Sequence, residues 1–264
     1  MATPAAIRVL EHELLLYRRA FRGTLVSSFL NPVLYLAAMG VGLGAYVATG
    51  KGGAAASAAL LGGVSYLAFL APGLLASTAM QVAAGESTFP IMGGILWDRT
   101  FFGMLATPIG VVDILVGKLL YICLRLALAT CIFFGVMTVF GAATGPQAFF
   151  AIPAAILTGL AFATPIIAFS ASRKDPSGFN SLFRFGVIPL FLFSGTFFPV
   201  SQLPGFLQPV AFATPLWHGV DLCRTLALGT ATPIGALVHV AYLVGVAALG
   251  LGLASIALRR RLRQ

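Results

Sequence analysis

Long runs of apolar residues make up most of this chain, and short stretches rich in charge, proline or glycine separate them. A helix needs about 20 apolar residues to cross the hydrocarbon core of a bilayer. By this rule the pattern predicts six transmembrane helices, at residues 25–47, 59–83, 109–139, 147–170, 181–200 and 233–257. The expected fold class is an all-α integral membrane protein, with residues 1–264 forming a single transmembrane domain.

The first 22 residues follow a different pattern. Apolar positions recur every three or four residues, while Arg8, Arg18 and Arg22 occupy other faces. This spacing predicts an amphipathic helix over residues 1–22 that lies in the headgroup region of the membrane. An ordinary solvated helix is the alternative, but it suits the pattern less well because the first predicted span begins directly afterwards.

Two of the connections are too apolar to be ordinary loops. Residues 84–108 mix large apolar side chains with Glu86, Asp98 and Arg99, which predicts a helix lying at the cytoplasmic surface. Residues 199–232 contain four prolines that interrupt an apolar stretch. Broken helices at membrane depth are tolerated only against protein or a water-filled cavity. This connection therefore predicts a re-entrant external segment before the last span.

Threonine followed by proline recurs at several predicted boundaries. Threonine is a good N-cap, and proline suits the first position of a helix because its missing N–H is not needed there. Helix starts are therefore predicted at Thr107-Pro108, Thr214-Pro215 and Thr232-Pro233. Thr164-Pro165 falls inside a predicted span, where the proline should kink the helix.

Charge excludes a soluble protein and predicts the sidedness of the chain. Only 9% of the residues are charged, against roughly 25% in soluble domains. Most of the 16 Lys and Arg flank one set of span ends, and four arginines close the chain at Arg259, Arg260, Arg261 and Arg263. Basic residues beside spans stay on the cytoplasmic side. We therefore expect a multi-pass protein of the inner (plasma) membrane with both termini cytoplasmic, and no nucleic-acid partner.

Motifs for catalysis are not found in the sequence. The nearest match to a phosphate loop, Gly50-Lys51, lacks both the upstream glycine and the following Ser or Thr that such a loop requires. The three histidines, His12, His218 and His239, are scattered along the chain. We therefore expect neither a catalytic site nor a metal or cofactor site in this chain.

Four charged or titratable residues are candidates for a translocation path or gate. Arg125 lies inside the third predicted span, and a charge within the membrane is a functional hypothesis by default; pairing with a carbonyl or with another subunit is the alternative. His218, Asp221 and Arg224 recur every three residues and so share a helix face. They form either an outer gate that contacts polar substrate or a local charge network that caps an outer helix.

The order of these parts, from the basic N-terminal helix to the broken segment before the last span, resembles that of the ABC-2 type transporter permeases. Within them the chain is most similar to the nodulation-protein-J branch and its drug-resistance relatives. The stretches that carry the resemblance are Asn31-Pro32-Val33-Leu34-Tyr35, Leu70-Ala71-Pro72-Gly73-Leu74, Glu86, Ala106-Thr107-Pro108-Ile109 followed by Asp113, and Pro215-Leu216-Trp217-His218-Gly219.

The resemblance implies a separate ABC ATPase subunit, which binds ATP and Mg, and a second permease copy in a homodimer or a heterodimer. The segment after the second span would then be a coupling helix on that ATPase. Glu86, Asp98 and Arg99 would make its polar contacts, while Trp97 and Phe101 would anchor it. ATP binding would shift these helices and open a path between the two permeases.

The resemblance also implies the direction and class of transport, namely export of a lipid-linked or hydrophobic substrate such as a lipo-oligosaccharide, a polysaccharide on a lipid or a drug. An ion-coupled secondary transporter is the alternative. That class favours internal repeats and acidic residues in the middle of spans. Loss of the ATPase would stop transport only in the first case.

Overall fold

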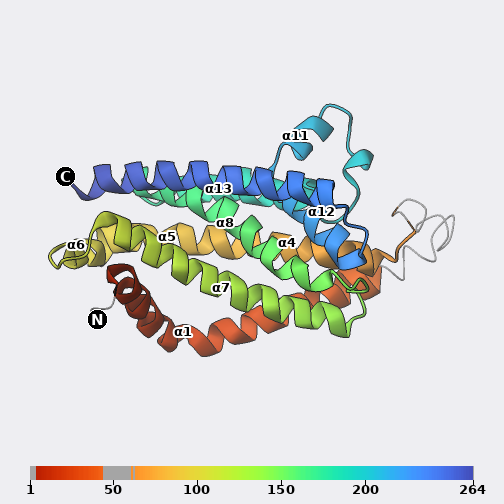
Figure 1. Ribbon diagram of the computed structural model, residues 1–264, viewed down its shortest axis with the longest axis horizontal. Coiled ribbons are helices and arrows are strands. Elements are labelled where there is room, and N and C mark those ends of the chain that lie inside the picture. The colour runs from red at the N-terminus through yellow and green to blue at the C-terminus, as the bar shows by residue number, and fades with distance from the viewer. Residues whose placement is uncertain (1–3, 44–60, 62, 264) are drawn as a thin grey trace.

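The computed structural model describes residues 4–43, 61 and 63–263. Within these residues the secondary structure is entirely helical, and the longer helices run side by side along the long axis of the molecule (Figure 1). The residues between the first two predicted spans (48–58) and the last residues of the first predicted span lie outside the described residues.

Four helices of the described part are long and apolar enough to cross a membrane. They are Tyr66–Trp97, which begins with α4 (Tyr66–Ser87), then α7 (Val111–Val139), Ala148–Ser172, which contains α8 (Ala151–Ser172), and α13 (Pro233–Leu262). These helices fall on the predicted spans 59–83, 109–139, 147–170 and 233–257, but the helix at the second span continues to Trp97. The other two predicted spans contain only shorter apolar helices, Ser28–Met39 and Ser177–Phe193, so the count of six is not confirmed.

The N-terminal part is one continuous helix. α1 runs from Ala5 to Tyr35 and passes into a π-helical stretch, η1 (Leu36–Leu43). The amphipathic segment 1–22 and the first predicted span therefore join without a break. Figure 1 shows that α1 changes direction along its length, so its two halves lie at different angles to the other helices.

The segment 84–108 differs from the expected helix at the membrane surface. Its first half extends α4 through α5 (Phe89–Met92) and η2 (Gly93–Trp97), and α6 (Thr100–Leu105) then leads back toward α7. The turn is made at Arg99, whose backbone is left-handed with φ of 51°. The segment is thus the tip of a helical hairpin, which Figure 1 shows at the end of the molecule that holds both termini. We call this end the terminal end.

The fifth predicted span, 181–200, ends earlier than its apolar run. α9 (Ser177–Leu182), η4 (Phe183–Val187) and α10 (Ile188–Phe193) form one helix that stops before Gly195. Gly195 has φ of +81°, a conformation that cannot continue a right-handed helix and that glycine adopts at little cost. The chain therefore turns away after Phe193.

Short helices make up the broken segment predicted at 199–232. They are η5 (Val200–Gln202), α11 (Gln208–Phe212) and α12 (Pro215–Leu228). Two of the predicted helix starts are confirmed, because Thr214 Oγ1 accepts the Trp217 N–H at 3.3 Å and Thr232 Oγ1 accepts the Gly235 N–H at 3.2 Å.

The start predicted at Thr107-Pro108 is wrong. α7 begins at Val111, after Gly110, whose N–H donates to the carboxylate of Asp113 at 2.9 Å. This side chain supplies the cap, so the helix begins three residues after the proline. Pro165, in contrast, lies inside α8 as predicted.

α8 lies at the centre of the bundle, and small residues allow its neighbours to approach closely. A Cβ added to Gly219 of α12 would lie 2.3 Å from Thr158 Oγ1, and one added to Gly250 of α13 would lie 2.4 Å from Thr164 Oγ1. Such approaches favour association of helices inside a membrane, where burial of apolar surface no longer drives packing.

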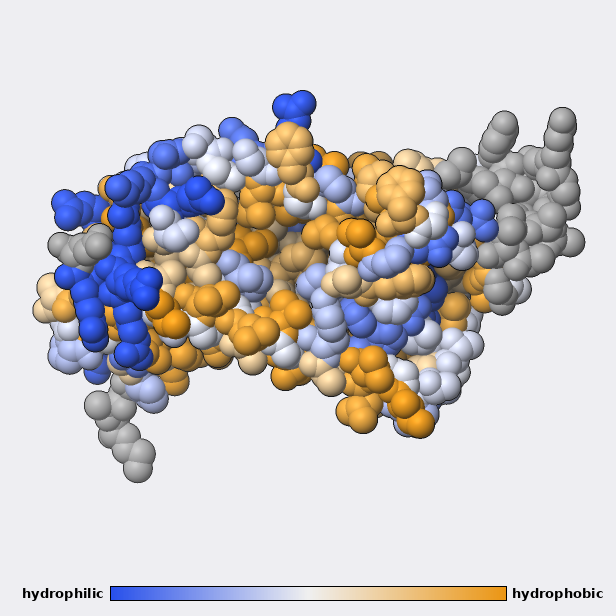
Figure 2. Space-filling model, turned by 90° about the horizontal axis from the view of Figure 1, so that it is seen from above, coloured by the Kyte–Doolittle hydropathy of each residue, from blue (hydrophilic) through white to orange (hydrophobic). Residues whose placement is uncertain are grey.

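The surface agrees with a protein that spans a bilayer. Figure 2 shows strongly hydrophilic side chains gathered at the terminal end, next to a middle zone in which hydrophobic side chains predominate. α1 begins and α13 finishes at this same end (Figure 1).

Candidate functional site

A groove lies between the end of α1, the middle of α4 and the helix that contains α10. It consists of two adjoining cavities with volumes of about 230 Å³ and 350 Å³. Tyr35, Gln81 and Phe191 line both. Because α4 is one of the four candidate spans, the groove lies within the membrane-spanning part of the molecule. We call it the α1–α4–α10 groove.

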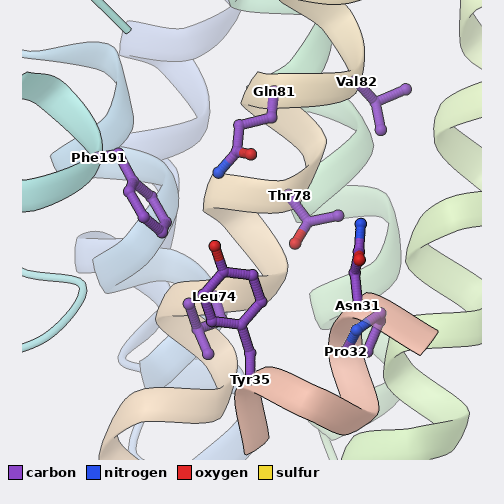
Figure 3. A pocket seen from close by; sticks show the side chains of 8 residues that line it. All are labelled: Asn31, Pro32, Tyr35, Leu74, Thr78, Gln81, Val82 and Phe191. Carbon is purple, nitrogen blue, oxygen red and sulfur yellow. The ribbon is translucent and has the colours of Figure 1, made fainter. Parts of the chain in front are cut away.

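Polar side chains from two helices turn into this groove. Thr78 and Gln81 are three residues apart on one face of α4, and Asn31 and Tyr35 are four apart on α1. Figure 3 shows the hydroxyls of Tyr35 and Thr78 and the amide of Gln81 directed toward one space, with the ring of Phe191 on its other side. Within the described residues, none of the hydrogen bonds between side chains involves these four groups.

Polar groups at membrane depth are costly unless they hydrogen-bond to protein, water or a ligand. The groove thus combines two amides and two hydroxyls with apolar walls such as Leu74 and Phe191. This arrangement suits a molecule with a hydrogen-bonding part and an apolar part. None of these side chains was predicted as a site residue, although Asn31 and Tyr35 lie in a stretch that carries the family resemblance.

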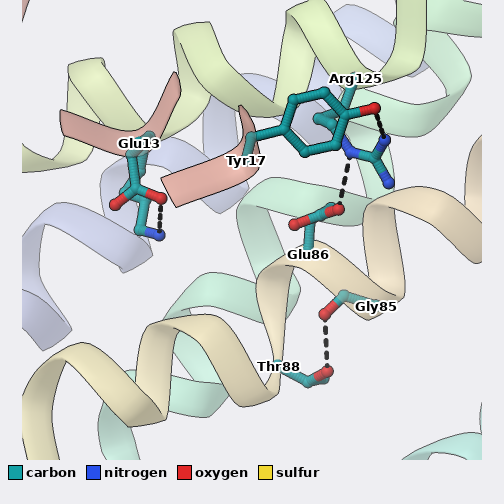
Figure 4. A network of polar contacts seen from close by, with 7 residues as sticks. Glu13, Tyr17, Gly85, Glu86, Thr88 and Arg125 are labelled. Atoms are coloured by element: carbon teal, nitrogen blue, oxygen red, sulfur yellow. Dashed lines mark hydrogen bonds and ion pairs between the residues drawn. The ribbon is translucent and has the colours of Figure 1, made fainter. Parts of the chain in front are cut away.

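Arg125 is paired with an acidic residue of the same chain. Its Nε donates to Glu86 Oε1 at 2.9 Å, and its Nη1 donates to the Tyr17 hydroxyl at 2.8 Å (Figure 4). The guanidinium also lies over the Tyr17 ring, 4.6 Å from its centroid. The sequence left a backbone carbonyl or another subunit as alternative partners for Arg125. The structure pairs it instead with a carboxylate of α4.

A second ion pair lies further along α7 and joins it to α1. Lys118 Nζ is 2.8 Å from Glu13 Oε2, and these side chains are only 5% and 9% exposed. A dashed line at Glu13 marks this ion pair in Figure 4. The helices approach closely beside it, since a Cβ added to Gly117 would lie 2.5 Å from Val9 Cβ. α1 is therefore fastened to α7 by two polar contacts and one tight apolar contact.

The residues predicted to couple the chain to an ATPase do not all lie together. Trp97, Asp98 and Arg99 are exposed at the hairpin tip, whereas Glu86 faces Arg125 inside the bundle. Phe101 is 1% exposed and packs against Gly94, where an added Cβ would lie 2.6 Å from the ring. The geometry leaves three of the five side chains available to a partner. The coupling roles stay predictions.

The predicted outer cluster is divided between two sets of partners. His239 of α13 joins His218 and Asp221, since its Nδ1 is 2.9 Å from the Nδ1 of His218 and its Nε2 is 3.1 Å from Asp221 Oδ2. Arg224 turns elsewhere, and donates to the carbonyls of Phe69 at 3.0 Å and Gly195 at 2.7 Å. A role of these residues in a path or gate stays a prediction.

Side chains that ligate metals are His, Cys, Asp and Glu. In the described ranges, no group of three or more His, Cys, Asp or Glu residues is placed to hold a metal ion. The side chains that line the α1–α4–α10 groove offer hydrogen bonds and apolar contacts.

Comparison with known proteins identifies the family. The model of the ABC-2 type transporter family matches residues 6–228. Nodulation protein J of Rhizobium leguminosarum bv. trifolii is 32% identical over 84% of this chain and 81% of its own length. Nodulation protein J of Rhizobium meliloti is 30% identical over 97% and 93%, and that of Bradyrhizobium diazoefficiens is 32% identical over 94% and 89%. The chain thus belongs to the ABC-2 type transporter family, as a transmembrane transport subunit.

Proposed function

We propose that this chain is the permease subunit of an ATP-driven exporter that moves a lipid-linked or hydrophobic substrate out of the cytoplasm. A separate ABC ATPase subunit binds ATP and Mg and hydrolyses the ATP. The observation that carries this proposal is the α1–α4–α10 groove, where polar side chains without protein partners in the described residues line an otherwise apolar wall.

The substrate that fits this groove best is an amphiphile. Amides and hydroxyls both donate and accept hydrogen bonds, so Gln81, Thr78 and Asn31 can bind the hydroxyl and amide groups of a sugar headgroup. Phe191 and Leu74 supply an apolar surface for an acyl chain. A lipo-oligosaccharide has both parts, and the family resemblance points to the same class.

Coupling to the ATPase takes place at the hairpin tip. Trp97 is 55% exposed there and stacks on Phe89, with 6.5 Å between the ring centroids, which gives the partner a rigid aromatic contact. Asp98 and Arg99 add charge of both signs. The terminal end then faces the cytoplasm of the inner membrane, in line with the positive charge of Arg259, Arg260 and Arg261.

A second permease copy completes the path. The α1–α4–α10 groove is open on one side, and large apolar side chains beside it are exposed, with Leu34 at 55% and Ile188 at 52%. Another copy that faces this side would enclose the groove between the two chains. The copy is identical in a homodimer and related in a heterodimer.

Transport measured in membrane vesicles with the ATPase subunit present tests the proposal. Thr78→Val with Gln81→Leu removes two hydrogen-bonding groups at about 1 kcal/mol each, which corresponds to a fall in substrate affinity of about 30-fold. Gln202→Leu, at an exposed position of η5 far along the chain, is the matched control and should leave transport unchanged.

Two results would contradict the proposal. If the groove variant and the control transport substrate equally well, the groove is not part of the translocation path. Transport that continues when the ATPase subunit is deleted would instead favour an ion-coupled secondary transporter.

A further inference from the structure

A second groove lies between α8 and α13 near the terminal end, away from the α1–α4–α10 groove. Its volume is about 600 Å³. Apolar residues of both helices form its walls, and basic residues lie at its cytoplasmic rim as the proposed topology orients it. We call it the α8–α13 groove.

The two helices are in close contact at one end of the groove. Gly250 packs directly on Thr164 and Pro165, since an added Cβ would lie 2.4 Å from Thr164 Oγ1 and 2.6 Å from Pro165 Cδ. Proline inside a helix removes one backbone hydrogen bond and bends the helix away from its own axis. From Pro165 onward the space between the helices is lined by Phe169 of α8 and by Leu253 of α13.

Three cations converge on the rim of this groove, namely Lys174, Arg260 and Arg261. The ion pairs of the described residues join Lys118, Arg125 and His239 to carboxylates. Lys174, Arg260 and Arg261 take part in none of these pairs. Asp175, next to Lys174, accepts hydrogen bonds from the backbone and side chain of Ser177 instead.

The walls below the cations are apolar and face outward. Leu253 is 58% exposed and Ile256 is 48% exposed, which is the surface that a bilayer covers. Arg173 lies over the ring of Phe169 at 4.2 Å from its centroid, and so adds a further positive charge beside the groove. The α8–α13 groove therefore places positive charge at the headgroup level and apolar side chains directly beneath it.

We propose that the α8–α13 groove binds one anionic phospholipid of the cytoplasmic leaflet. Its phosphate is held by Lys174, Arg260 and Arg261, and an acyl chain lies along Leu253 and Ile256. Basic pockets between transmembrane helices on the cytoplasmic side favour anionic headgroups because the cations have no other counter-charge. The bound lipid contacts both α8 and α13.

Lipid binding to the full-length chain in neutral detergent tests this assignment. The chain is mixed with phosphatidylglycerol or phosphatidylcholine at equal concentration, and bound lipid is counted by native mass spectrometry. We expect one phosphatidylglycerol to be retained about tenfold more strongly than phosphatidylcholine, because only the former carries net negative charge. The groove variant Lys174→Gln/Arg260→Gln/Arg261→Gln should lose this preference.

A matched control variant distinguishes lipid binding in the groove from general attraction of an anionic lipid to a positively charged protein. Arg8→Gln/Arg259→Gln/Arg263→Gln removes the same number of positive charges at exposed positions that do not line the groove, and should keep the preference. Exchange of the basic residues for each other, as Lys174→Arg/Arg260→Lys/Arg261→Lys, keeps all three charges and should also keep it. This variant shows whether a loss in the first variant reflects charge or misfolding.

Three results would overturn the proposal. The first is equal loss of the preference in the groove variant and in its matched control, which would indicate diffuse attraction. The second is equal retention of the two lipids by the unaltered chain. The third is displacement of the lipid by glycerol 3-phosphate at the same concentration, since an acyl chain would then contribute nothing and the site would bind only a free anion.

Discussion

The side chains of Arg125 and Glu86 join the middle of α7 to the end of α4 through a charged hydrogen bond of 2.9 Å. Tyr17 of α1 accepts a second hydrogen bond from the same guanidinium. Three helices thus meet just before the segment that leads to the hairpin tip. Movement of that segment by an ATPase would reach α1 and α7 through this contact.

Loss of one partner of this pair should destabilise the bundle. In Arg125→Gln the carboxylate of Glu86, with its side chain 18% exposed, is left without its cation. Truncating one member of a desolvated charge pair costs about 2–5 kcal/mol, and partial exposure places this pair near the lower value. Thermal unfolding of the purified protein in detergent measures the change.

A double variant tells whether the cost comes from the stranded charge. Arg125→Gln with Glu86→Gln removes both charges and should unfold at a higher temperature than Arg125→Gln alone. If the two effects simply add, the residues do not interact energetically and the pairing has no influence on stability.

Disruption of the ion pair between Glu13 and Lys118 should lower the stability of the protein more than disruption of the Arg125–Glu86 pair. The reason is that both side chains of the Glu13–Lys118 pair are almost fully buried. Lys118→Glu sets two carboxylates against each other and is expected to release the first part of α1 from α7. The exchanged pair Lys118→Glu/Glu13→Lys should recover most of the stability, and protease sensitivity of the N-terminal helix is the measurement. Equal sensitivity of the single and exchanged variants would contradict this pairing.

The approach of α13 to α8 predicts a contrast between two glycines that are two residues apart. Gly250→Ala places a methyl group against Thr164 and Pro165, and overpacking of this kind costs about 1–3 kcal/mol. Gly252→Ala meets no atom within 4 Å, so its effect should be near zero or slightly stabilising. Unfolding midpoints of the two variants in detergent compare them, and equal midpoints would be inconsistent with the close contact.

The hairpin tip can be tested without disturbing the core. Trp97→Ala removes an exposed aromatic ring, so the fold should persist while binding of the ATPase subunit weakens by about 2 kcal/mol, the cost typical of an aromatic hot spot. Co-purification and substrate-stimulated ATPase activity report the loss. Phe206→Ala, which removes a ring that is 76% exposed in the broken segment, serves as control. An unchanged complex with Trp97→Ala would remove this residue from the coupling contact.

Several features follow from the order of residues alone. The four candidate spans coincide with apolar runs, because a helix in hydrocarbon must satisfy its own backbone and present apolar side chains over its whole length. Thr214 and Thr232 cap helices because their hydroxyls reach the backbone three residues on. Local chemistry of this kind needs no knowledge of the neighbouring helices.

Local signals failed where a nearby residue or backbone geometry competed with them. Thr107-Pro108 has the same composition as the other starts, yet Asp113 caps α7 instead. The apolar run of the fifth predicted span continues beyond Phe193, but the positive φ of Gly195 ends the helix. Hydropathy does not distinguish apolar residues in a helix from apolar residues in a turn that packs against protein.

The apolar runs and the basic ends of the sequence were enough to predict a helical membrane protein, because membrane thickness and charge act on each segment separately. The pairing of Arg125 with Glu86, 39 residues away, and the shared groove of Asn31 and Gln81 follow only from how the helices pack. In a spanning helix the lipid-facing and protein-facing sides are both apolar. The pattern therefore carries little information on which faces meet, and only the packed helices reveal the partners.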